Sequence, residues 1–94
     1  MRKHFVVVSY DICNDRRRRK VMKIMEGFGE RVQYSVFECR LTLAQVGRLQ
    51  KRLRRWVNPQ EDSVRFYFLT RRETGRILVL GVGEVTPERR YYVL

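Results

Sequence analysis

Residues 5–10 read Phe5-Val6-Val7-Val8-Ser9-Tyr10, a short run of β-branched and aromatic side chains. The apolar residues follow one another instead of alternating with polar ones, which is typical of a strand covered on both faces. Residues 11–14 (Asp, Ile, Cys, Asn) then break the pattern. We therefore predict a central β-strand over residues 5–10, with Asp11 at its carboxyl end.

Two amphipathic helices are predicted after this strand. The first has an apolar face at spacings i, i+3, i+4 and i+7, formed by Val21, Ile24, Met25 and Phe28. Asp15 is placed to cap its start. Gly27 and Gly29 stand where a left-handed residue would end it.

The second helix is predicted to open at Thr42, because Thr42 and Gln45 have the spacing of a capping box. Asn58-Pro59 is expected to stop it. Its buried face would comprise Val46, Leu49, Leu53, Trp56 and Val57.

Further strands are predicted over residues 31–39, 63–69, 77–82 and 91–94, with a turn over residues 70–75. The alternation blurs near Phe37-Glu38, which indicates a bulge or bend. The order of elements predicts an α+β fold in one domain over residues 1–94. We expect a ferredoxin-like sandwich of the βαββαβ type, in which two helices cover one face of an antiparallel sheet. The other face would be open and apolar, and a second protomer would cover it most simply.

The composition is strongly basic. Lys and Arg total 21 against 10 Asp and Glu, a net charge of +11, so a polyanion such as DNA or RNA is the expected partner. A thermophile surface rich in ion pairs is the alternative, but such networks need both signs of charge. The two cysteines are expected to be reduced and His4 to be structural. No segment approaches the ~18 apolar residues of a membrane span, so we expect a soluble cytoplasmic protein.

Two basic segments are candidates for nucleic-acid contacts. Residues 16–20 place five cations in the first turns of a helix, where they oppose the helix dipole, so we interpret them as placed for an anion. The second helix carries a basic face that suits sequence-independent phosphate binding, although a merely solvated face is an even alternative. The candidate nucleic-acid-binding residues are Arg16, Arg17, Arg19, Lys20, Arg48, Lys51, Arg52 and Arg55, and Arg54 lies on the same face.

Four stretches together resemble the CRISPR-associated Cas2 family: residues 9–12, the Arg-rich segment 16–20, residues 29–39 (GERVQYSVFEC) and residues 61–67 (EDSVRFY). The resemblance runs from the first strand through the strand predicted over residues 63–69, and residues 31–39 are its most specific part. It implies a ferredoxin-like homodimer whose last strand, here residues 91–94, adds to the partner's sheet. It also implies a role beside the Cas1 integrase in capturing DNA fragments and inserting them into the CRISPR array.

Some family members are metal-dependent nucleases on single-stranded RNA or double-stranded DNA, and the resemblance carries a candidate site with it. Asp11 is the candidate ligand of Mg²⁺ or Mn²⁺, and two Asp11 side chains meeting across a dimer axis would supply a pair of carboxylates. A turn-forming role for Asp11 is the alternative. The other candidate catalytic residues are Tyr10, Arg18, Arg31 and Phe37.

Three of these residues could instead have a purely structural role. Tyr10 would pack in the core, Arg31 would lie on the surface and Phe37 would lie in a dimer interface. The Arg run leaves the register open between Arg17/Arg19 and Arg18/Lys20, and the distance of Arg18 from Asp11 favours Arg18. Ser35, with no base in its motif, is interpreted as structural.

Three functions are consistent with these residues. The first is a Mg²⁺-dependent phosphodiesterase centred on Asp11, and the second is a non-catalytic adaptor that holds DNA and bridges integrase dimers. The third, an RNA-binding module that stacks bases on sheet aromatics, predicts an aromatic signature that this chain lacks. A toxin-type ribonuclease of the same fold is a distant alternative.

Overall fold

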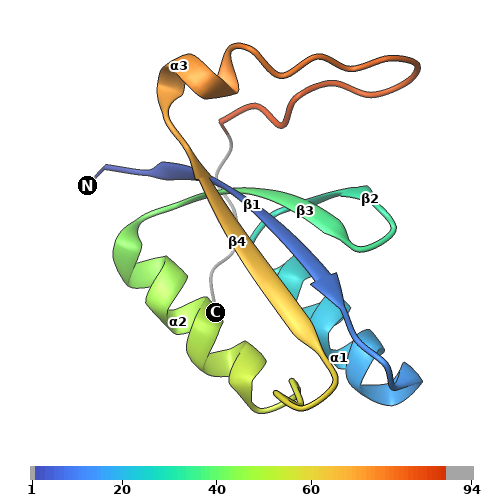
Figure 1. Ribbon diagram of the computed structural model, residues 1–94. Helices are drawn as coiled ribbons and strands as arrows, with labels where there is room; N and C mark the ends of the chain where they lie inside the picture. Colours follow the sequence, from blue (N-terminus) through green and yellow to red (C-terminus); the bar gives the residue numbers. More distant parts are fainter. Residues whose placement is uncertain (1, 89–94) are drawn as a thin grey trace.

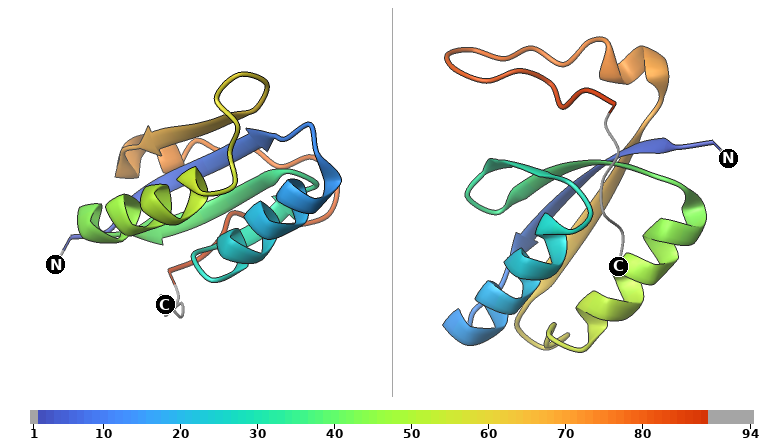
Figure 2. Two further views of the ribbon diagram at one scale, coloured as in Figure 1. Left: turned by 90° about the horizontal axis from the view of Figure 1, so that it is seen from below. Right: turned by 180° about the vertical axis from the view of Figure 1, so that it is seen from behind.

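A computed structural model describes residues 2–88 of the protein. One four-stranded antiparallel sheet has the order β2-β3-β1-β4, and helices α1 and α2 lie side by side on one of its faces (Figures 1 and 2). The elements are β1 (His4–Asp11), α1 (Asp15–Glu26), β2 (Glu30–Gln33), β3 (Val36–Leu41), α2 (Leu43–Arg54), β4 (Ser63–Leu69) and α3 (Arg71–Thr74). This arrangement confirms the predicted α+β fold.

Strand β1 is the central strand that its apolar run predicts. It pairs with β3 on one side and β4 on the other. Val6, Val8 and Tyr10 point toward the helices and are buried in the core with Val21, Met25, Leu49 and Leu53. The pairing with β3 ends at Ser9, whereas the pairing with β4 continues to Asp11, so Ser63 of β4 fixes the position of Asp11 at the strand end.

The predicted caps of α1 are wrong in detail. Asn14, not Asp15, is the N-cap, and its side chain accepts a hydrogen bond from the Arg17 N–H at 2.9 Å. Gly27 ends the helix with a φ of −81°, so no left-handed residue is used there. Instead the Gly27 N–H donates to the Ile24 carbonyl at 3.1 Å, a tightened last turn that any residue could adopt.

The capping box of α2 is confirmed. The Gln45 N–H donates to Thr42 Oγ1 at 3.2 Å, and the Thr42 N–H donates to Gln45 Oε1 at 2.8 Å. The helix ends at Arg54, ahead of the predicted stop at Asn58-Pro59. Val46, Leu49 and Leu53 are buried as predicted, and Trp56 and Val57 pack partly buried against the same core.

The single strand predicted over residues 31–39 is wrong, because these residues form a hairpin. β2 and β3 are joined through a turn at Tyr34 and Ser35, where the Ser35 carbonyl accepts the Tyr10 N–H at 3.0 Å. This contact supports the structural interpretation of Ser35. The predicted bulge or bend near Phe37-Glu38 is also misplaced, because the shift in strand register lies between Arg31 and Gln33.

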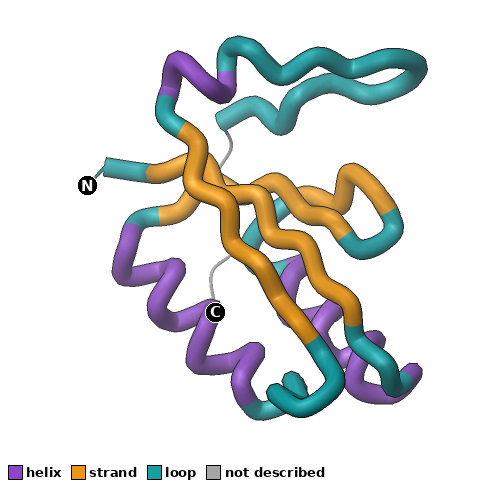
Figure 3. The backbone as a smooth tube through the Cα atoms, in the orientation of Figure 1, coloured by secondary structure: helices purple, strands orange, loops and turns teal. Residues whose placement is uncertain are grey.

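Strand β4 has the predicted bounds, but the chain after it does not follow the prediction. Within the predicted turn, residues 71–74 form the short helix α3, which begins with a capping box of Thr70 and Glu73. Residues 77–82 are not a strand; they run as a loop beyond the end of the sheet, and the chain then returns to β3 at Thr86 (Figures 1 and 3). Strand structure needs a hydrogen-bonded neighbour, and this segment finds none within residues 2–88. The strand predicted over residues 91–94 lies outside the described residues.

The second face of the sheet is mixed rather than apolar. It carries Val7, Arg65 and Tyr67, by alternation with the buried residues of β1 and β4. Part of it is covered by the chain itself, because Glu38 and Arg40 of β3 hold the backbone of Thr86 at 2.9 to 3.2 Å. None of the helices in residues 2–88 has the length and apolar character needed to cross a bilayer.

The two thiols are expected to differ in reactivity. Cys39 is fully buried, and burial first, then the charge of Glu38, raises its pKa to about 12. Cys13 is exposed, and its thiol donates to the Glu61 carbonyl at 3.0 Å. Ellman's reagent should therefore titrate Cys13 in the native protein and reach Cys39 only on unfolding, because the thiolate is the reactive species. Equal labelling rates in native protein would contradict the buried position of Cys39.

Candidate active site and nucleic-acid interface

Asp11 presents an exposed carboxylate at the end of β1. Its backbone lies opposite Ser63 of β4, and strand alternation directs its side chain to the face away from the helices. Within residues 2–88 the carboxylate takes part in none of the hydrogen bonds or ion pairs of the structure, and no cluster of three or more His, Cys, Asp or Glu side chains could hold a metal ion. One chain therefore offers a free carboxylate but an incomplete set of metal ligands.

Tyr10 and Phe37 lie on the opposite, helix-covered side of the sheet. Their rings stack at 6.3 Å between centroids with an interplanar angle of 25°, and both are buried. Burial raises the pKa of Tyr10, and the nearby positive charges of Arg31 and Arg18 only partly oppose it. Tyr10 therefore stays protonated near neutral pH, which makes it a hydrogen-bond donor rather than a base.

The interpretation of Phe37 as part of a dimer interface is wrong. Its side chain is wholly buried in the core of its own protomer, where it packs under the helices. Strand alternation explains this, because Phe37 pairs with Val8, whose side chain points the same way.

Arg31 lies at the exposed β2 edge on the same side as Tyr10. Its Nε donates to the Tyr34 carbonyl at 3.0 Å, and its guanidinium lies 5.1 Å from the Tyr34 ring centre. Arg31 also contributes a positive charge to the surroundings of the Tyr10 hydroxyl.

Arg18 reaches the segment that follows Asp11. Its Nη1 donates to the Ile12 carbonyl at 2.8 Å, and its Nη2 pairs with Asp15. The guanidinium thus holds the β1–α1 connection close to the end of β1. Of the two registers left open by the Arg run, this placement favours the one that contains Arg18.

Arg17 is engaged by two carboxylates of the segment that precedes β4. Its Nη2 lies 2.7 Å from Glu61 Oε2 and 3.0 Å from Asp62 Oδ2. These pairs favour a structural role over the predicted contact with nucleic acid, because a guanidinium held by two carboxylates is already neutralised.

Asp62 is the central residue of this network, and the sequence analysis did not identify it. Its fully buried carboxylate accepts the Cys13 N–H at 2.9 Å, the Asn58 N–H at 2.8 Å and the Arg17 side chain. Burial alone would raise its pKa, but the backbone hydrogen bonds from Cys13 and Asn58 and the Arg17 interaction outweigh burial and lower it. Asp62 therefore connects the segment before β4 to the segment after β1. The only sign of this role in the sequence was the acidic pair Glu61-Asp62 directly before a predicted strand.

The remaining cations of both helices are free of carboxylate partners among residues 2–88, where the ion pairs involve only Arg17 and Arg18. Arg16 and Lys20 instead lie over the ring of Trp56. The exposed or half-exposed cations on this side of the molecule are Arg16, Arg19, Lys20, Arg48, Lys51, Arg52, Arg54 and Arg55. The helix layer is therefore a surface of unneutralised positive charge.

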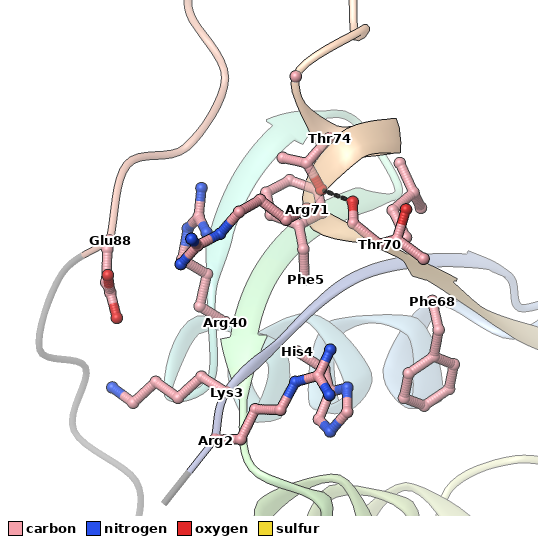
Figure 4. Close-up of a pocket in the computed structure, with 12 residues that line it drawn as sticks. Arg2, Lys3, His4, Phe5, Arg40, Phe68, Thr70, Arg71, Thr74 and Glu88 are labelled. Atoms are coloured by element: carbon pink, nitrogen blue, oxygen red, sulfur yellow. Dashed lines mark hydrogen bonds between the residues drawn. The ribbon is translucent and has the colours of Figure 1, made fainter.

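A cavity of about 870 Å³ lies at the other end of β1 (Figure 4). Arg2, Lys3 and Arg71 are among the residues that line it, beside the aromatic rings of Phe5 and Phe68. Since His4 and Phe5 begin β1 and Asp11 ends it, this cavity is separate from the Asp11 carboxylate.

Comparison with known proteins decides the family. Residues 4–77 match the sequence profile of the family described as CRISPR associated protein Cas2. The chain belongs to the Cas2 family. A curated Cas2 relative, "CRISPR-associated endoribonuclease Cas2 3" of Chloroflexus aurantiacus, is 41% identical over 92 residues, which covers 98% of this chain and 99% of the relative.

Solved Cas2 structures share the fold. Streptococcus pyogenes Cas2 superposes with a TM-score of 0.73 and 36% identity, over 82% of this chain and 99% of that one. A chain of a structure described as "Partial Cas6-RT-Cas1--Cas2 complex" gives a TM-score of 0.66 at 25% identity, over 82% of this chain and 90% of that one. The family match to residues 4–77 includes all the candidate catalytic residues and ends where the chain leaves α3 for the loop.

Proposed function

We propose that this Cas2 chain acts in CRISPR adaptation as a homodimer that binds protospacer DNA, bridges dimers of the Cas1 integrase and cleaves RNA or DNA with a divalent metal ion. The endoribonuclease name of the Chloroflexus relative supports a nuclease, and the similarity to a chain of a Cas1–Cas2 complex supports the partner. The observation that carries the catalytic part is the free Asp11 carboxylate at the end of β1, where Asp11 pairs with Ser63 of β4.

Asp11 fits a hard cation such as Mg²⁺ or Mn²⁺, which prefers oxygen ligands. A second Asp11, from the partner protomer, would complete the pair that one chain lacks. When bound, the metal ion would activate water and neutralise charge on the phosphate. Arg18 holds the backbone just after Asp11 through the Ile12 carbonyl, and Tyr10 and Phe37 form the packed layer beneath the strand end.

The nucleic acid would lie along the positive surface of the helices. Arg16, Arg19, Lys20 and the cations of α2 are available for phosphates, since no carboxylate among residues 2–88 pairs with them. Contacts with phosphates do not distinguish one base from another, so binding should be independent of sequence and should weaken steeply as the salt concentration rises.

Asp11→Asn should abolish most metal-dependent cleavage of labelled single-stranded RNA or double-stranded DNA. We expect a loss of roughly 100-fold or more, the scale for removing one group that stabilises developing charge. Glu84→Gln, a change of an exposed carboxylate on the distant loop, is the matched control and should leave the rate unchanged. The rates are compared in Mg²⁺ and in EDTA, with fold and oligomeric state checked for each variant.

Wild-type protein that cleaves neither substrate, or an Asp11→Asn variant that cleaves as fast as wild type, would exclude the Asp11 mechanism. That result would support the alternative function, a non-catalytic adaptor. It is favoured by the incomplete set of metal ligands in one chain, and it requires DNA binding by the helix surface in both the wild type and the Asp11 variant.

A further inference from the structure

Trp56 occupies a defined place between the two helices. It follows the end of α2, where its N–H donates to the Leu53 carbonyl at 2.9 Å. One part of its side chain packs against the hydrophobic core, and the rest remains accessible. Figure 2 shows α1 running beside α2 on the same face of the sheet, and α1 supplies the residues that cover the ring.

Two cations of α1 meet on this ring. The guanidinium carbon of Arg16 lies 5.6 Å from the ring centre, and Lys20 Nζ lies 5.3 Å from it. Residues four apart lie one above the other on a helix, so a single turn of α1 presents both charges to one aromatic ring. Trp56 thereby fixes the positions of two long, otherwise mobile side chains.

The charge on this cluster is not balanced. Among residues 2–88, the ion pairs involve Arg17 and Arg18, and no carboxylate pairs with Arg16 or Lys20. Attraction to an exposed aromatic ring is modest, and the two cations repel each other. Arg52, in the last turn of α2, adds a further positive charge to the helix layer. An anion held between these cations would remove the repulsion.

We propose that Arg16, Lys20 and Trp56 form one binding site for a backbone phosphate of nucleic acid, with the ring holding the two cations in place. This inference rests on the nucleic-acid-binding function proposed above and deepens it. The basic run of α1 then has two roles, because Arg17 and Arg18 hold the fold near Asp11 whereas Arg16 and Lys20 hold the ligand. Trp56 is a positioning residue at this site.

Tryptophan emission can report on this site alone, because Trp56 is the single tryptophan of the chain. We would titrate the full-length protein with an unlabelled DNA duplex while following Trp56 emission. In parallel, the anisotropy of the same duplex carrying a dye would report total binding. We expect emission to change saturably, with the same midpoint as anisotropy.

Variants test the two cations and the ring separately. Arg16→Ala combined with Lys20→Ala should weaken binding by about tenfold and reduce the slope of log affinity against log salt by about 2. Trp56→Leu should weaken binding by about fivefold, whereas Trp56→Phe, which keeps a ring, should stay within about twofold of wild type. Arg72→Ala combined with Arg76→Ala removes two exposed cations that lie outside α1 and α2 and should leave the slope unchanged.

The outcomes are distinct. DNA binding with unchanged Trp56 emission, or an Arg72/Arg76 double variant that weakens binding as much as the Arg16/Lys20 one, would refute the proposed phosphate site and leave general nucleic-acid binding intact. Absence of any anisotropy change would refute nucleic-acid binding itself. Circular dichroism and melting of each variant show that a loss of affinity is not a loss of fold.

Discussion

Replacing Asp62 with alanine is expected to lower the free energy of unfolding by about 3 kcal/mol, the scale for breaking a buried, charge-paired hydrogen-bond network. The change leaves the N–H groups of Cys13 and Asn58 without their acceptor and removes one partner of Arg17. The measurement is urea denaturation followed by circular dichroism at neutral pH. Asp62→Asn keeps the shape and one acceptor oxygen, so it should cost less than alanine.

The contribution of Asp62 should also depend on pH in a stated direction. Its pKa in the folded protein lies below the ordinary 3.8. A lowered folded-state pKa means that the stabilisation is complete above the unfolded pKa and is lost as pH falls through the folded one. The difference in stability between wild type and Asp62→Asn should therefore shrink on acidification below about pH 4.

The control for this network is Glu61→Gln. Glu61 also pairs with Arg17, at 2.7 Å, but its side chain is 47% exposed whereas that of Asp62 is fully buried. Exposed ion pairs contribute little, so Glu61→Gln should change stability by well under about 1 kcal/mol. A cost for Glu61→Gln as large as that for Asp62→Ala would place the energy in the ion pair and not in the buried acceptor.

Gly29→Ala is expected to destabilise the fold by about 2 kcal/mol or more through overpacking. A Cβ at Gly29 would lie 2.4 Å from Cys39 Sγ and 2.6 Å from the Glu38 carbonyl oxygen. Buried backbone of β3 supplies one of these contacts and cannot rotate away. Thermal melting and urea denaturation give the cost directly.

Two further variants keep this prediction specific. Gly47→Ala lies on an exposed position of α2 with open space around the new Cβ, so it should raise stability by about 0.5–1 kcal/mol through helix propensity. Cys39→Ala removes the sulfur, so Gly29→Ala should cost less in that background while the clash with the carbonyl persists. Gly29→Ala as harmless as Gly47→Ala would show that the chain near Gly29 can move aside.

Much of the fold could be predicted because its signals are local. The run Val6-Val7-Val8 identifies the central strand, and the spacing of Thr42 and Gln45 identifies the cap of α2. The split of residues 31–39 was missed because Tyr34 and Ser35 continue the alternation of a strand, while the turn there depends on a contact with Tyr10 from another strand. Residues 77–82 have the composition of a strand, but pairing requires a neighbour that the sequence does not specify.

The sequence predicted which residues belong to the candidate site but not how their side chains are arranged in space. Asp11 and Tyr10 are adjacent in sequence, yet the structure places their side chains on opposite faces of the sheet. Asp62 was missed because its role arises from two loops 49 residues apart in the chain, Cys13 to Asp62, and no local pattern encodes that contact.

The alternation of side chains along β1 decides on which face of the sheet the candidate metal ligand Asp11 lies. Each added or removed residue turns every later side chain of a strand to the other face. A single deletion between Val8 and Asp11 would direct the carboxylate into the helix-packed interior, whereas a deletion of two would return it to the open face. The chemistry of this end of the molecule is therefore tied to an even or odd count along one strand, and evolution in that segment can proceed by substitution or by paired length changes but not by single ones.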